Sequence, residues 1–152
     1  MLTNMSLEEK ITRDIKNAML TKNNMKLQVC RSIKSAILIA KTEKGGVELN
    51  QEKEIEILQR LLKQRRESEK IYREKSRFDL ANEEYEQANI ILMYLPEPYT
   101  LEETEKLISV VMKDLDVNSK KDMGKLISEV IKRGKGRVSG KTASSLIQKK
   151  MN

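Results

Sequence analysis

Apolar residues recur along this chain at intervals of three and four, the spacing that places side chains on one face of an α-helix. The first such helix is expected over residues 7–22, behind a capping box formed by Ser6 and Glu9. A second apolar stripe follows and ends before the flexible glycine pair at residues 45–46. The chain is therefore predicted to open with two amphipathic helices joined by a short polar turn.

Two further helices are predicted before residue 95. Asn50 is suited to cap a long third helix, whose apolar positions give way to charge, so we expect its second half to project into solvent. Arg31, Arg65 and Arg66 are expected on the surface. A fourth helix begins near Asp79 and must end ahead of the proline at position 96.

A domain boundary is predicted around Pro96 and Pro98. Proline biases the residue before it away from helix, and the charge balance of the chain changes just beyond this point. We expect an N-terminal helical domain over residues 1–95 and a small basic tail domain over residues 96–152.

Three shorter helices are predicted in the tail, the middle one ending at Gly134. Residues suited to capping precede each of them: Thr100 with Glu103, Ser119 with Asp122, and Ser139. No segment alternates with a period of two over the length of a strand. The predicted fold is all-α, with an N-terminal bundle of about four helices followed by a three-helix domain.

Positive charge is concentrated at the carboxyl end of the chain. The 152 residues carry a net charge of +7, and residues 1–100 contain 18 basic and 16 acidic side chains. From Val117 to Asn152 there are ten basic residues and two acidic ones. Such a surface favours a phosphate-rich partner, because binding releases counterions. Aromatic residues make up 3% of the chain, so we expect RNA to be held mainly through its phosphates.

The chain has few residues that are suited to catalysis or to metal binding. The chain has no histidine and a single cysteine, Cys30, which lies in an apolar stripe and is expected in the core. Neighbouring carboxylates such as Glu83 and Glu84 face different sides of a helix. We therefore predict no catalytic residue, no metal and no cofactor.

A cytoplasmic location without membrane contact is expected. No apolar run approaches the roughly 20 residues of a membrane span, and the first ten residues lack the apolar core of a signal peptide.

The glycine-rich stretch from Gly136 to Thr142 is the candidate binding loop. It resembles a phosphate-binding P-loop but has three residues between its glycines instead of four, and it follows a helix. It also lacks the third glycine of a dinucleotide-binding fingerprint. What remains is a basic loop with exposed backbone amides beside the start of a helix, and both could approach a phosphate closely. The alternative is that these glycines only form a turn and the lysines are solvated.

Nine residues are predicted to bind nucleic acid: Lys121, Lys125, Lys132, Lys135, Arg137, Lys141, Gly124, Gly136 and Gly140. The first three lysines fall on the side of the sixth helix opposite its apolar stripe. A glycine inside that helix, Gly124, costs about 1 kcal/mol relative to alanine. We attribute it to close helix packing, with close approach of a ligand as the alternative.

Four segments make the chain resemble the YqeY-like family, which shares a domain with the C-terminal part of the GatB subunit of aspartyl/glutamyl-tRNA amidotransferase. They are Arg77-Phe78-Asp79-Leu80 leading to Glu84, Tyr94-Leu95-Pro96-Glu97, Ser119-Lys120-Lys121-Asp122-Met123-Gly124-Lys125, and Lys135-Gly136-Arg137-Val138-Ser139-Gly140-Lys141. The chain departs from the family pattern at Pro98, where glutamine is common, and at Ser139, where aspartate is common.

The resemblance implies a helical domain followed by a tail that contacts the body of a tRNA. In the amidotransferase, the chemistry resides in a separate domain and a glutaminase subunit, so a label of carbon-nitrogen ligase with glutamine as amido-N-donor would be inherited by homology alone. We expect a tRNA- or RNA-binding accessory module without a catalytic site. Its partners would be tRNA or another structured RNA, and an amidotransferase or aminoacyl-tRNA synthetase protein.

Two other functions stay open at this point. The chain could be a component of a glutamine-dependent amidotransferase that needs a partner subunit. It could instead be a helical adaptor that recruits another protein through residues 63–75.

Overall fold

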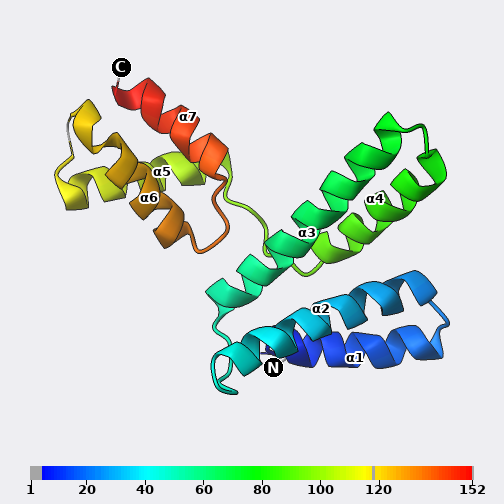
Figure 1. The fold of residues 1–152 in the computed structure, drawn as a ribbon. Helices are drawn as coiled ribbons and strands as arrows, with labels where there is room; N and C mark the ends of the chain where they lie inside the picture. Colours follow the sequence, from blue (N-terminus) through cyan, green and yellow to red (C-terminus); the bar gives the residue numbers. More distant parts are fainter. Residues whose placement is uncertain (1–4, 118, 152) are drawn as a thin grey trace. The chain divides into compact units, whose positions relative to one another are not determined.

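A computed structural model describes residues 5–117 and 119–151, which form seven α-helices, a 3-10 turn and no strand (Figure 1). The prediction of an all-α fold is confirmed for these residues. Contacts divide the chain into two compact units, one up to Leu95 and the other from Pro96 onward. Among the described helices, none is long and apolar enough to cross a bilayer.

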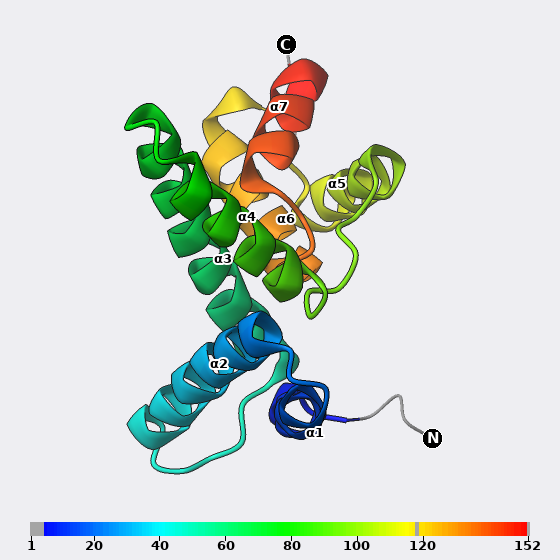
Figure 2. The same ribbon diagram turned by 90° about the vertical axis from the view of Figure 1, so that its right-hand side faces the viewer.

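The first unit is built from two helical hairpins. One pairs α1 (Leu7–Leu20) with α2 (Asn24–Glu43), and the other pairs α3 (Gln51–Glu74) with α4 (Phe78–Leu92), as Figures 1 and 2 show. Helix α2 packs against both members of the second hairpin. The apolar stripes meet in one core, formed by Leu7, Ile11, Val29, Cys30, Ile33, Ile37, Ala40, Ile57, Leu58, Leu61 and Ile91.

Local side-chain hydrogen bonds start these helices where the sequence predicts. The Ser6 hydroxyl accepts a backbone hydrogen bond at 3.2 Å, and the Asn50 side chain accepts one at 2.8 Å. Both caps are confirmed, but the predicted box of Ser6 with Glu9 is incomplete, because Glu9 Oε1 accepts from the Ser6 hydroxyl at 3.1 Å instead of from the Ser6 N–H. Helix α1 ends at Leu20, earlier than expected, and the chain turns through a left-handed conformation at Lys22, with φ of 58°.

The second half of α3 does not stand alone in solvent, because α4 packs along it. Arg65 is half-buried there: its Nη2 donates to Ser32 Oγ at 3.3 Å, and its Nε lies 3.9 Å from Glu84 Oε2. The expectation of a surface position for Arg65 is therefore wrong. Its partners come from α2 and α4, which local sequence spacing does not bring next to it.

A polar contact closes the core between α1, α2 and the end of α4. The Tyr94 hydroxyl donates to Asp14 Oδ2 at 2.5 Å and lies 3.3 Å from Cys30 Sγ. Burial, and then the hydrogen bond to Asp14, raise the pKa of Tyr94 above its ordinary range. Burial likewise raises the pKa of the Cys30 thiol. Cys30 is fully buried, as predicted.

The second unit consists of α5 (Leu101–Leu115), α6 (Met123–Gly134) and α7 (Gly140–Met151), each of which contacts the other two. Thr100 and Glu103 form the predicted capping box, with reciprocal hydrogen bonds of 3.1 and 3.0 Å. The buried residues form a second core: Ile108, Val111, Val117, Leu126, Val130, Val138, Ala143 and Ile147.

The start of α6 differs from the prediction. Ser119 precedes the 3-10 turn η2 (Lys120–Asp122) and Asp122 precedes α6, but neither side chain makes a capping hydrogen bond. The chain enters α6 through this tight turn, in which the Asp122 N–H donates to the Ser119 carbonyl at 3.1 Å. The predicted cap of α7 is confirmed, because Ser139 Oγ accepts a backbone hydrogen bond at 3.4 Å.

Candidate nucleic-acid interface

The predicted lysines of α6 lie on its solvent side. Lys125 and Lys132 are exposed, while Leu126 and Val130 on the other side of the helix are buried in the core. Lys125 and Lys132 are two helical turns apart, roughly 10 Å along the axis. The amphipathic pattern of α6 thus fixes which way these two side chains face. Lys121 is exposed as well, but the prediction that it belongs to this helix is wrong, because it lies in the preceding turn η2.

Two acidic neighbours of this surface are already engaged by one arginine, while Asp122, next to Lys121, is in no ion pair of the described residues. Arg133 Nη1 lies 2.7 Å from Asp114 Oδ2, and its Nε lies 3.1 Å from Glu129 Oε1. The hydrogen bond to Asp114, then that to Glu129, raise the pKa of Arg133, so this guanidinium stays charged. In the part of the chain that the structure describes, no carboxylate forms an ion pair with any of the five predicted lysines: Lys121, Lys125, Lys132, Lys135 and Lys141.

A tight loop joins α6 to α7. Helix α6 includes Gly134, and the chain turns left-handed only afterwards, at Lys135 and Gly136, with φ of 48° and 83°. A Cβ at Gly134 would lie 2.8 Å from Val138 Cβ, closer than side-chain carbons pack. Glycine is therefore required where the loop folds back on the helix. The sequence identified Gly134 as a helix end but gave no sign of this contact.

The loop sets the start of α7 beside the last turns of α6. A Cβ at Gly140 would lie 3.5 Å from Ile131 Cδ1, which is ordinary contact distance. Exposed Lys132, Lys135 and Lys141 belong to the last turn of α6, the loop and the start of α7. Lys125 belongs to the other end of α6, and Lys121 to the turn η2 that precedes it.

Arg137 is held by the segment that precedes α5. Its Nε donates to the Glu97 carbonyl at 2.8 Å, its guanidinium lies over the Tyr99 ring, and its own carbonyl accepts the Tyr99 N–H at 2.8 Å. Arg137 thus anchors the loop inside the second unit. Sequence reasoning missed this role, because these partners are about 40 residues away in the chain.

Gly124 is exposed near the start of α6, and a Cβ built there meets nothing within 4 Å. The explanation of this glycine by helix packing is therefore wrong. Close approach of a ligand, the alternative, is compatible with an open backbone at this position.

The described residues contain no group of three or more cysteine and carboxylate side chains placed to hold a metal ion. The charges of the second unit instead separate by helix. Helix α5 and the residue after it carry five acidic and two basic side chains, whereas the chain from Val117 onward carries two acidic and ten basic ones.

A family model described as Yqey-like protein matches residues 8–151. The chain belongs to the YqeY-like family. The matched region takes in both units and all nine residues predicted to bind nucleic acid, so the family resemblance drawn from the four sequence segments is confirmed. No curated protein sequence matches the chain.

Proposed function

We propose that this YqeY-like protein binds structured RNA, tRNA foremost, as an accessory module of the cytoplasm without a catalytic site of its own. The observation that carries the proposal is the set of five exposed lysines on η2, α6, the following loop and the start of α7, none of them in an ion pair among the described residues. Phosphates meeting such a surface release counterions, which is the main source of affinity in non-specific nucleic-acid binding.

The internal charge separation of the second unit supports a defined orientation on the RNA. Asp114 and Glu129 are both occupied by Arg133, and Asp122 is the other carboxylate from Val117 onward, so the α6–α7 side is left with an excess of cations. The acidic side chains of α5 are repelled by phosphate. RNA is therefore expected to contact the α6–α7 side of this unit and to avoid α5.

From the resemblance to the GatB tail, we further propose that the protein acts together with the enzymes of tRNA-dependent amidation. In this proposal the protein partner is an amidotransferase or an aminoacyl-tRNA synthetase, and the chemistry belongs to that partner.

A salt titration of tRNA binding by the full-length protein tests the proposal. If about five phosphates are neutralised, the slope of log affinity against log salt should lie near −4, at roughly −0.7 to −0.9 per contact. Absence of measurable tRNA affinity at low salt would refute the proposal.

A charge-matched pair of variants locates the surface. Lys125→Glu with Lys132→Glu should weaken binding strongly and flatten the salt slope by about 2, because two phosphate contacts are lost. Lys106→Glu with Lys113→Glu changes the net charge equally, but on α5, and should have a much smaller effect. Equal losses from both pairs would show that net charge, and not this surface, determines binding.

A further inference from the structure

Helix α4 presents an exposed stripe in which apolar and amide side chains alternate. Phe78, Tyr85 and Leu92 follow one another at seven-residue intervals and are 55%, 51% and 39% exposed. Exposed Asn82 and Asn89 lie between them on the same side of the helix. The adjoining side of α4, toward α3, provides Ala81, Ala88 and Ile91 to the interior.

The spacing of these five residues is four, three, four, three, which is the spacing of a coiled-coil seam. Phe78, Tyr85 and Leu92 occupy one of the two seam positions of each heptad, and Asn82 and Asn89 occupy the other. A buried asparagine at that second position favours parallel pairing in a fixed register, because its amide finds a partner in the same residue of the facing helix. The seam extends over roughly 21 Å from Phe78 to Leu92.

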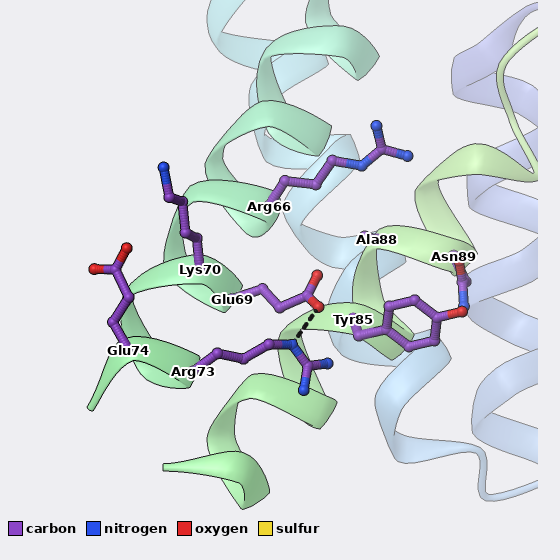
Figure 3. Close-up of a pocket in the computed structure, with 8 residues that line it drawn as sticks. All are labelled: Arg66, Glu69, Lys70, Arg73, Glu74, Tyr85, Ala88 and Asn89. Carbon is purple, nitrogen blue, oxygen red and sulfur yellow. Dashed lines mark hydrogen bonds and ion pairs between the residues drawn. The ribbon is translucent and has the colours of Figure 1, made fainter. Parts of the chain in front are cut away.

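A basic wall borders the seam on the side of α3. Figure 3 shows Arg66 and Arg73 reaching from α3 toward Tyr85 and Asn89 of α4, around a groove of about 570 Å³. Arg73 is bonded to Glu69 at 2.8 Å and donates to Asn82 Oδ1 at 3.4 Å, whereas Arg66 and the neighbouring Lys70 are in no ion pair within the described ranges. Three basic and two acidic residues of α3 line the groove, so this edge carries a net positive charge.

An acidic flank borders the seam on its other side. Asp79, Glu83 and Glu86 lie on the exposed surface of α4 away from α3. Arg77 lies 3.4 Å from Asp79, but Glu83 and Glu86 take part in no ion pair of the described residues. An apolar seam therefore separates edges of opposite charge.

We propose that this face of α4 is a self-association surface, on which a second copy of the chain packs with its own α4 parallel to the first. In a parallel pair, a two-fold axis along the helices sets the basic wall of each copy against the acidic flank of the other. An antiparallel pair would oppose like walls, basic to basic and acidic to acidic. Charge complementarity and the asparagine register both select the parallel arrangement.

The seam spans only about two heptads, so the interface belongs to the small and transient class. Sedimentation equilibrium of the full-length protein from roughly 1 μM to 1 mM should show a reversible monomer and dimer equilibrium. A protein that stays monomeric over that range overturns the proposal.

A substitution at the centre of the seam tests whether the contact between the two copies lies on this face of α4. Tyr85→Asp should raise the dissociation constant tenfold or more, because the interface would bury an unpaired charge at its middle. Ile39→Asp is the matched control, since Ile39 is 59% exposed on α2, and it should leave association unchanged. Loss of association in the control with none in Tyr85→Asp would assign the contact to α2 and overturn the proposal.

Charge reversal and rescue test the arrangement of the two edges. Arg66→Glu with Lys70→Glu makes both edges acidic, and Glu83→Lys with Glu86→Lys makes both basic. Each double variant should associate more weakly than the native protein, and an equimolar mixture should recover association as a heterodimer. If the mixture associates no more strongly than either double variant alone, the proposed pairing of basic and acidic edges is wrong.

Cross-linking distinguishes parallel from antiparallel. Asn82→Cys and Asn89→Cys, each oxidised separately, should form disulfide dimers in the parallel arrangement, because each residue faces its own copy. The native protein, whose Cys30 is buried, is the control. Dimers that form no disulfide at either position would show that the two α4 helices are not parallel and would overturn the proposed arrangement. Loss of tRNA affinity in Tyr85→Asp while the protein is monomeric would assign this face to RNA binding.

Discussion

Arg137 lies over the ring of Tyr99, with the guanidinium carbon 4.6 Å from the ring centroid. The same side chain donates to the Glu97 carbonyl, so the loop between α6 and α7 is fastened to the segment that leads into α5. A residue predicted to grip phosphate is thereby also an anchor within the second unit.

Arg137→Lys should lower the free energy of unfolding by about 1 kcal/mol and Arg137→Ala by about 1–2 kcal/mol, because lysine keeps the charge but loses the planar stacking and the fixed hydrogen bond. Urea denaturation followed by circular dichroism measures both. Lys141→Ala, at an exposed lysine without an ion pair among the described residues, is the control and should leave stability unchanged. Equal stability of Arg137→Ala and the native protein would show that the anchor contributes nothing.

The two glycines of α6 should respond in opposite directions to the same substitution. Gly134→Ala sets a methyl group against Val138 and should destabilise the protein by about 1–3 kcal/mol, since the loop cannot move away without losing its buried contact. Gly124→Ala meets open space and should stabilise the helix by up to about 1 kcal/mol.

Gly124→Ala also tests the RNA surface, because it changes the backbone exposure of α6 without removing a charge. If RNA approaches the helix closely at this point, the alanine variant should bind tRNA more weakly while being at least as stable. Unchanged affinity would limit the role of Gly124 to helix propensity.

The hydrogen bond between Tyr94 and Asp14 should make stability depend on alkaline pH. The pKa of Tyr94 is raised in the folded protein, so its contribution is complete below the unfolded value near pH 10 and is lost as the pH rises above it. At neutral pH, Tyr94→Phe should cost about 1–3 kcal/mol, because Asp14 loses its donor.

The difference in unfolding free energy between the native protein and Tyr94→Phe should therefore shrink above about pH 10, where the unfolded chain ionises first. Urea titrations at a series of pH values measure it. The raised pKa of Cys30 acts in the same direction but is present in both proteins, so it cancels in large part. A difference that stays constant with pH would mean that Tyr94 ionises equally easily in both states.

The features that sequence could predict are those determined within a few residues. The caps at Ser6, Asn50 and Thr100 each depend on a hydrogen bond across three positions, and each was identified from the residue types alone. The apolar stripes likewise gave the helices and the burial of Cys30.

What sequence could not predict depends on contacts between distant segments. The half-buried place of Arg65 is decided by Ser32 and Glu84 on other helices, and the anchoring of Arg137 by Glu97 and Tyr99. The exposure of Lys125 and Lys132 needed no such contact, because the apolar stripe on the opposite face of α6 already fixed it.

The tail domain remains a prediction, and expressing residues 96–152 alone would test it. The second unit has its own core, including Leu126, Val130 and Ile147, but a chain of this size is only marginally able to fold by itself. We expect a helical spectrum, a cooperative thermal transition and retained affinity for tRNA. A shorter piece, residues 100–152, keeps all three helices and the Thr100 cap but lacks the segment that holds Arg137, so it should melt at a lower temperature. An unfolded longer piece would show that this unit depends on the rest of the chain, and equal melting of the two pieces would show that the anchor is dispensable.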